Sequence, residues 1–212
     1  MRTGPGGPVL FCERMSDYFG VFGLPRKLQV DLGDLQRRFY ELSFAHHPDF
    51  HQSGGSVEQA AALERSALIN RAYRALRDPL ARVEYLIALE EGRETREGGS
   101  ARPKVPMELL EEMLEVQESL EGARAAGLGE ASVARLREER QRLRDRQAAE
   151  EAAIVTRAAD WDRIVEGGGD RRALLEWFKQ KLAARAYLLT VIDDLTVALG
   201  ESQESHVSHR RH

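Results

Sequence analysis

Apolar residues recur every three or four positions through most of the chain, which is the spacing of amphipathic helices. Val, Ile and Thr with turns at short spacing, the pattern typical of strands, are sparse. The stripes predict helices around Leu35, Phe39 and Leu42; Leu63, Ala67, Tyr73 and Leu76; Leu80, Val83 and Ile87; Leu109, Met113, Val116 and Leu120; Val133, Leu136, Leu143, Ile154 and Trp161; and Leu174, Phe178, Leu182, Leu189, Ile192 and Leu199.

Glycine- and proline-rich segments divide these helices into two groups. Residues 52–56 are a loop by composition, and residues 167–169, all glycine, interrupt the last helical region. Residues 92–106 have no apolar period and are typical of a linker between domains. We therefore expect short helices over residues 15–91, a three-helix bundle over residues 107–200, a disordered segment over residues 1–14 and a flexible tail over residues 201–212.

The composition narrows the function classes. A net charge of −4 gives no overall electrostatic case for nucleic-acid binding. A single cysteine, Cys12, excludes an internal disulfide and cannot hold a zinc or an iron–sulfur cluster, so no metal or cofactor is expected. No apolar run approaches the roughly 18 residues of a membrane span, and the first residues lack a signal-peptide core. We expect a cytoplasmic protein, and the start could equally be Met15.

One predicted helix carries more apolar surface than a single buried face needs. About 100° per residue places Met107, Leu110 and Leu114 in a second sector, beside the stripe that begins at Leu109. Two explanations stay open: the second sector packs against another helix of the bundle, or it is an exposed partner site. Carboxylates border this sector, and no Lys or Arg occurs between Val105 and Ala123; the bordering residues are Glu111, Glu115 and Glu118.

The next predicted helix is rich in arginine, from Arg135 to Arg146. A glycine-containing turn separates the acidic helix from the basic one. We expect the two helices to pair as an antiparallel hairpin. Exposed ion pairs contribute only about 0–1 kcal/mol each, so the apolar stripes must supply the stability.

The segment that carries chemistry is His47-Pro48-Asp49, between a predicted helix and the loop at residues 52–56. Proline disfavours helical geometry at the preceding residue, so the helix must end near His47. Side chains displayed in such a turn are available to a partner. An alternative treats His46, His47, Asp49 and His51 as metal ligands, but these do not converge readily around Pro48, and zinc needs three or four convergent ligands.

The flanking segments make the tripeptide informative. Asp-Tyr-Phe at residues 17–19 and Phe-Gly-Leu-Pro at residues 22–25 lie upstream, and Leu-Gln-Arg-Arg-Phe at residues 35–39 leads into it. Asp-Pro-Leu-Ala-Arg-Val-Glu-Tyr-Leu at residues 78–86 lies downstream. Together these resemble a J-domain, and more closely the HscB-type co-chaperones of iron–sulfur cluster assembly. The resemblance covers roughly residues 16–199, tightly in the first domain and loosely in the second.

The resemblance implies an L-shaped all-α protein, in which a four-helix J-domain precedes a three-helix bundle and Phe39, Leu42, Tyr73 and Leu76 are buried together. It implies an activator rather than an enzyme: proteins of this family stimulate the ATPase of a DnaK- or HscA-type chaperone and deliver the scaffold protein IscU to it. The resemblance implies His47, Pro48 and Asp49 as chaperone-binding residues. Further candidates on the preceding helix or directly after the tripeptide are Arg37, Arg38, Phe44 and Phe50. The implied scaffold-binding residues are Met107, Leu110, Leu114, Glu115 and Glu118, with Phe178 or its neighbour Trp177.

This sequence departs from the usual J-domain pattern where the chaperone would bind. Phe50 stands where a lysine is usual after the tripeptide, and Phe44 occupies a helix that usually carries several basic residues. The pattern predicts that Phe44 points away from the core stripe, either exposed or packed under another segment. Two other functions remain as alternatives: a J-domain co-chaperone for a different client, and a non-catalytic helical adaptor. The sequence contains neither a nucleophile elbow nor a phosphate-binding loop, so nothing in it indicates an enzyme.

Overall fold

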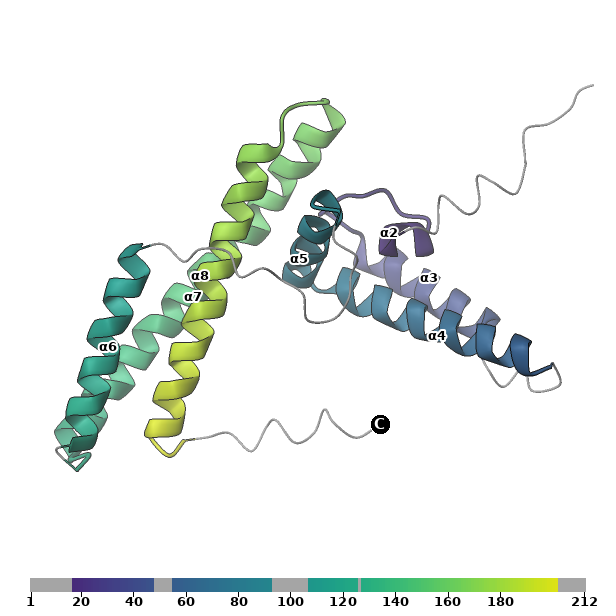
Figure 1. Ribbon diagram of the computed structural model, residues 1–212. Helices are drawn as coiled ribbons and strands as arrows, with labels where there is room; N and C mark the ends of the chain where they lie inside the picture. Colours follow the sequence, from purple (N-terminus) through teal and green to yellow (C-terminus); the bar gives the residue numbers. More distant parts are fainter. Residues whose placement is uncertain (1–16, 48–54, 93–106, 126, 202–212) are drawn as a thin grey trace, which may run out of the picture. The chain divides into compact units, whose positions relative to one another are not determined.

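The computed structural model describes residues 17–47, 55–92, 107–125 and 127–201, and all regular structure within these ranges is helical (Figure 1). The prediction of an all-α protein is confirmed. None of the described helices is both long and apolar enough to cross a lipid bilayer. The helices are α2 (Tyr18–Val21), α3 (Leu32–Ala45), α4 (Ser56–Arg77), α5 (Pro79–Glu90), α6 (Met107–Ala125), α7 (Glu130–Glu166) and α8 (Arg172–Ala198).

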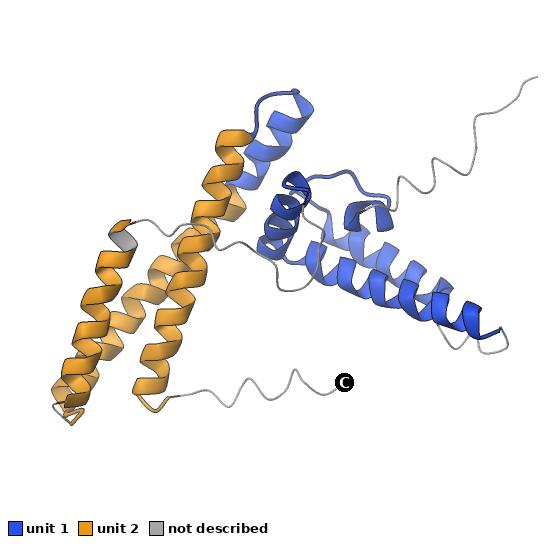
Figure 2. Ribbon diagram, viewed as in Figure 1, with its two compact units in different colours: residues 1–99, 157–171 blue, residues 100–156, 172–212 orange. Residues whose placement is uncertain are grey.

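The chain forms two compact units (Figure 2). Unit 1 comprises Met1–Gly99 together with Arg157–Arg171, and unit 2 comprises Ser100–Thr156 together with Arg172–His212. The long helix α7 therefore contributes to both units. This grouping places residues 157–171, which the apolar pattern assigns to the second domain, with the first helices of the chain.

Aspartates cap the N-termini of α3 and α5 in unit 1. Asp31 accepts hydrogen bonds from the backbone N–H groups of Gly33 and Asp34 at 2.8 and 3.1 Å, and so caps α3. Asp78 caps α5 through the N–H of Ala81 at 2.8 Å. Pro79 occupies the first turn of α5, where proline is favoured because it lacks the N–H that would be unpaired there.

The first helices of unit 1 share a core where α2, α3, α4 and α5 meet, and the fully buried side chains there include Phe19, Leu35, Leu76, Val83 and Leu86. The prediction that Phe39, Leu42, Tyr73 and Leu76 are buried together is wrong for three of the four residues, because only Leu76 is fully buried. Phe39 and Tyr73 stack across α3 and α4 with ring centroids 4.1 Å apart. Two paired helices shield only the faces that meet, so these stacked rings keep part of their surface exposed.

A buried polar cluster joins the segment before α3 to residues 157–171 within unit 1. The Asp162 carboxylate accepts hydrogen bonds from the backbone N–H groups of Leu28 and Gln29 at 2.7 and 2.8 Å. Arg82 donates to the backbone carbonyls of Leu76, at 2.7 Å, and of Leu28. Asp162 and Arg82 are both buried, and such groups are stable only when their hydrogen bonds are made. The cluster therefore fixes the path of the chain into α3.

Unit 2 is built from α6, α8 and most of α7, and its core is aliphatic. Val116 and Leu120 of α6 pack in one cluster with residues of the other two helices, among them Leu136, Leu143, Leu188 and Leu195. At one turn of α8, Leu188 is buried in place of the predicted Leu189, which is 37% exposed.

Ion pairs connect the three helices of unit 2. The predicted acidic–basic pairing of α6 and α7 occurs between Glu112 and Arg146. Arg137 and Arg140 of the same basic stretch instead pair with Glu201, just after α8, at 2.7 and 2.6 Å. The basic residues of α7 are therefore shared between α6 and the end of the bundle.

Candidate functional site

The end of α3 presents His47 to solvent. The helix ends at Ala45, and His46 caps it through a backbone N–H that donates to the carbonyl of Leu42 at 3.0 Å. His47 follows as an exposed residue outside the helix, as the proline rule predicts. Pro48, Asp49 and Phe50 lie outside the described residues.

An exposed strip of α3 leads up to His47. It consists of Arg37, Tyr40, Glu41 and Phe44, which helical geometry places within roughly 100° of one another. Tyr40 is 61% exposed and Phe44 is 71% exposed. Of the two arrangements left open for Phe44, the exposed one is found. The sequence interpretation missed Tyr40, although its spacing of three from Arg37 and four from Phe44 places it on the same face.

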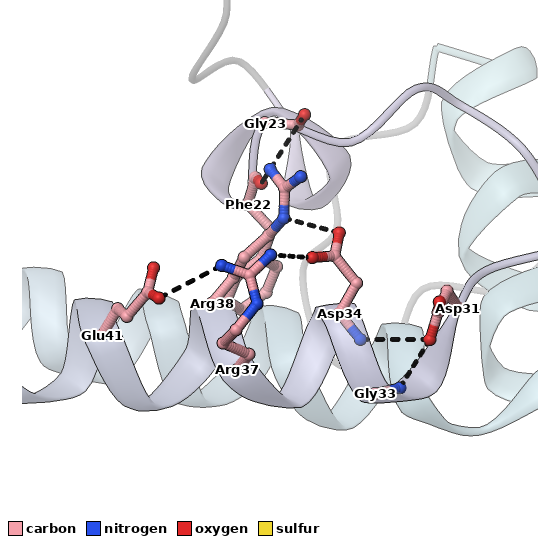
Figure 3. Close-up of polar contacts among 8 residues, drawn as sticks. All are labelled: Phe22, Gly23, Asp31, Gly33, Asp34, Arg37, Arg38 and Glu41. Atoms are coloured by element: carbon pink, nitrogen blue, oxygen red, sulfur yellow. Dashed lines mark hydrogen bonds and ion pairs between the residues drawn. The ribbon is translucent and has the colours of Figure 1, made fainter.

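Both arginines of α3 are engaged within the protein (Figure 3). Arg37 pairs with Asp34 and, at 3.2 Å, with Glu41. Arg38 contacts the second oxygen of Asp34 at 2.8 Å and donates to the backbone carbonyl of Phe22, also at 2.8 Å. Arg38 therefore ties α3 to the turn after α2, which is a structural role.

The ion pairs among Asp34, Arg37 and Arg38 favour the ionised forms of Asp34 and Arg37. Partial desolvation acts to raise the pKa of Asp34, but the hydrogen bonds and charges of Arg38 and Arg37 outweigh it, so the pKa of Asp34 is lowered from its ordinary value. The pKa of Arg37 is raised by the same contact with Asp34 and by Glu41. Because α3 contains two basic and two acidic residues, its side-chain charges balance.

The metal-site alternative gains no support from the part of the chain that is described. Within it, no three His, Cys, Asp or Glu side chains gather closely enough to hold an ion. Two of the ligands considered for such a site, Asp49 and His51, lie outside this part.

A second exposed surface lies on α6. Met107, Leu110 and Leu114 are 70%, 41% and 59% exposed, and we call these three residues the α6 patch. Glu111, Glu115 and Glu118 are exposed beside it. On the other side of the helix, Val116 and Leu120 are buried in the bundle. The explanation that places Leu110 and Leu114 in the bundle core is therefore wrong.

Phe178 does not lie on an exposed surface. It is fully buried, so the prediction that Phe178 contacts a scaffold protein is corrected: it follows Leu174 by one helical turn on the buried face of α8. The neighbouring Trp177, the alternative at this position, is half-buried. Its ring meets that of Phe178 edge-on, with centroids 5.5 Å apart, and Lys181 lies 5.7 Å from its centre.

Comparisons with known proteins identify the fold. No family model matches the sequence. Among solved structures, the chain is similar to the chaperone HscB from Vibrio cholerae, with a TM-score of 0.58 and 22% identity over 88% of this chain and 99% of that one. It is also similar to human co-chaperone protein HscB, with a TM-score of 0.59 and 24% identity over 92% of this chain and 93% of that one.

The class is thus an all-α protein in which a unit that contains the α3–α4 hairpin is followed by a bundle of α6, α7 and α8. More particularly, the chain has the HscB-type fold, as the sequence resemblance predicts.

Proposed function

We propose that this protein is a J-type co-chaperone of iron–sulfur cluster assembly. In this proposal His47, Pro48 and Asp49 stimulate ATP hydrolysis by a DnaK- or HscA-type chaperone. The α6 patch binds an IscU-type scaffold protein and delivers it to that chaperone. The observation that carries the proposal is an exposed His47, placed at the end of α3 within an HscB-type fold.

The position of His47 favours action on a partner rather than on this chain. Its side chain is exposed, and it stands where the helix ends and the tripeptide begins. Side chains in such connecting segments commonly serve binding while a rigid scaffold positions them. The protein would act as an activator of another protein's ATPase and not as an enzyme itself.

The α6 patch supports the scaffold half of the proposal. Exposed aliphatic residues bordered by charged residues are typical of protein–protein contacts. The border here is formed by Glu111, Glu115 and Glu118, so the patch fits a partner with an apolar centre and a basic rim. Any iron–sulfur cluster would be carried by that partner.

Single-turnover ATP hydrolysis by a purified DnaK-type chaperone of the source organism tests the first half. The wild-type chain should accelerate hydrolysis, and His47→Gln or Asp49→Asn should abolish the acceleration. His46→Gln is the matched control, because His46 contributes its backbone N–H to the helix cap and should keep the stimulation. Thermal melts of all variants should match the wild type. A large destabilisation by His47→Gln would mean that the tripeptide is structural.

Titration with a purified IscU-type scaffold tests the second half. Stimulation without scaffold binding would support a J-domain co-chaperone for another client. Neither stimulation nor binding would support a helical adaptor and would overturn the proposal.

A further inference from the structure

The strip of α3 next to His47 combines two exposed aromatic rings with arginines that already have partners. Tyr40 and Phe44, which we call the aromatic face, are among the most exposed large apolar residues of unit 1. The hydroxyl of Tyr40 accepts a hydrogen bond from Gln36 of the same helix at 3.3 Å. The ring of Tyr40 lies beside that of Phe39, with centroids 5.6 Å apart, and the residue is still 61% exposed to a partner.

The arginines of this helix offer little charge to a partner. Asp34 and Glu41 already offset the charge of Arg37, and a partner carboxylate that paired with either arginine would have to compete with them. Arg38 would also lose its bonds to the carbonyls of Phe22 and Gly23. Beyond these two residues, α3 contains no lysine or arginine.

We propose that α3 binds the chaperone through the aromatic face, which docks on an apolar surface of that partner without a net charge attraction. The inference rests on the proposed function and names the chemistry of the partner surface. The aromatic face continues along α3 to His47, so a chaperone that engages His47 also covers Tyr40 and Phe44. Aromatic residues at the centre of an interface commonly dominate its binding energy.

An apolar contact has a distinct dependence on salt. At about 0.1 M ionic strength charges are screened beyond about 10 Å, whereas apolar contacts are little affected. The chaperone concentration that gives half-maximal stimulation should therefore change less than about threefold between about 0.05 and 0.5 M KCl. A contact made by free arginines would weaken steeply over the same range.

The experiment measures this half-maximal concentration with the purified DnaK-type chaperone of the source organism. The double variant Tyr40→Ser with Phe44→Ser should raise it by about tenfold or more, the effect of losing central anchors. Leu32→Ser is the matched control, since Leu32 is 52% exposed on the same helix but lies at the end away from His47. This control should behave as the wild type.

Two results, one from the aromatic double variant and one from the salt series, would overturn the inference while leaving the proposed function intact. One is that the aromatic double variant has the same half-maximal concentration as the wild type, while stimulation still depends on His47. The other is a rise of more than about tenfold with salt in the wild type. Loss of stimulation by the Leu32→Ser control would show that any polar substitution on α3 is disruptive, and would also count against it. If the wild type gives no stimulation, the proposed function itself fails.

Discussion

The aromatic face of α3 and the α6 patch are both exposed and apolar, but they differ in how nearby charge is used. Beside the aromatic face, both arginines are held by Asp34 and Glu41. Beside the α6 patch, the carboxylates of Glu111, Glu115 and Glu118 form no ion pair with any residue in the described part of the chain. One surface is electrically balanced and the other is acidic.

This difference shows that charged residues near an interface do not by themselves predict electrostatic recognition. A balanced surface is expected to select its partner by shape and apolar contact. An acidic surface also steers a basic partner during diffusion, which raises the association rate more than the affinity. The two proposed partners should therefore respond differently to salt and to substitution.

The largest effect should come from a residue that sequence reasoning placed on the scaffold surface. Phe178→Ala should destabilise the fold by about 3–5 kcal/mol, the usual cost of truncating a buried phenylalanine. Leu114→Ala, the matched exposed control, should change stability by less than about 0.5 kcal/mol. Urea denaturation followed by circular dichroism checks both values. If the Phe178→Ala variant were as stable as the wild type, Phe178 would not be a core residue and could again be considered as a scaffold contact.

The next effect separates binding from folding on the α6 patch. Leu110→Ala with Leu114→Ala should weaken scaffold binding by about 2 kcal/mol, roughly a thirtyfold rise in Kd, if these residues are central contacts. The thermal melt should hardly change, because both residues are exposed. Calorimetric titration with an IscU-type scaffold measures the Kd. Unchanged binding in a folded variant would remove the α6 patch from the proposal.

Much of this contrast is readable in the sequence. Helical spacing predicts a second apolar sector at Met107, Leu110 and Leu114 but leaves open whether it is exposed or packed, and the structure shows that it is exposed. The spacing also predicts that Phe44 points away from the core. These inferences succeed because they depend only on position around a single helix.

Other features depend on distant segments and could not be predicted. The buried contact of Asp162 with Leu28 joins residues more than a hundred positions apart, and no periodicity signals it. The engagement of Arg38 by the Phe22 carbonyl likewise requires the fold. Phe178 was assigned to the scaffold surface by the resemblance, although the apolar stripe that it shares with Leu174 already indicates a buried position.

A smaller effect tests whether the arginines of α3 are structural. Arg38→Gln should lower stability by about 1 kcal/mol, since it removes a hydrogen bond to a backbone carbonyl and an ion pair on a half-exposed side chain. Arg37→Gln, the matched control on a more exposed side chain, should have little effect. Chemical denaturation measures both. If Arg38→Gln stays fully stable but loses chaperone stimulation, Arg38 is a docking residue.

The binding free energies at the two surfaces should differ in their response to salt by less than about 1 kcal/mol. The association rate of the scaffold with the α6 patch should fall severalfold between low and physiological salt, because the steering charges are exposed. Glu115→Gln with Glu118→Gln should remove part of this dependence and leave the dissociation rate almost unchanged. Stopped-flow binding measures both rates. A salt-independent association rate would mean that the carboxylates beside the α6 patch do not steer the partner, and the contrast with α3 would be lost.

The smallest effect concerns the carboxylate that balances α3. Asp34 has a pKa below its ordinary value of 3.8, so its ionised form is favoured in the folded state. Its contribution to stability should be present above that ordinary value and should be lost as the pH falls through the lowered pKa. The stability difference between the wild type and Asp34→Asn should therefore stay constant between about pH 5 and 8 and should close only below about pH 4, as followed by urea denaturation at each pH. A difference that closes between pH 5 and 7 would mean that Asp34 gains a proton near neutrality. Arg38 would then lose its counter-charge at neutral pH and Arg37 would keep only Glu41, so α3 would carry a net positive charge and would no longer be electrically balanced.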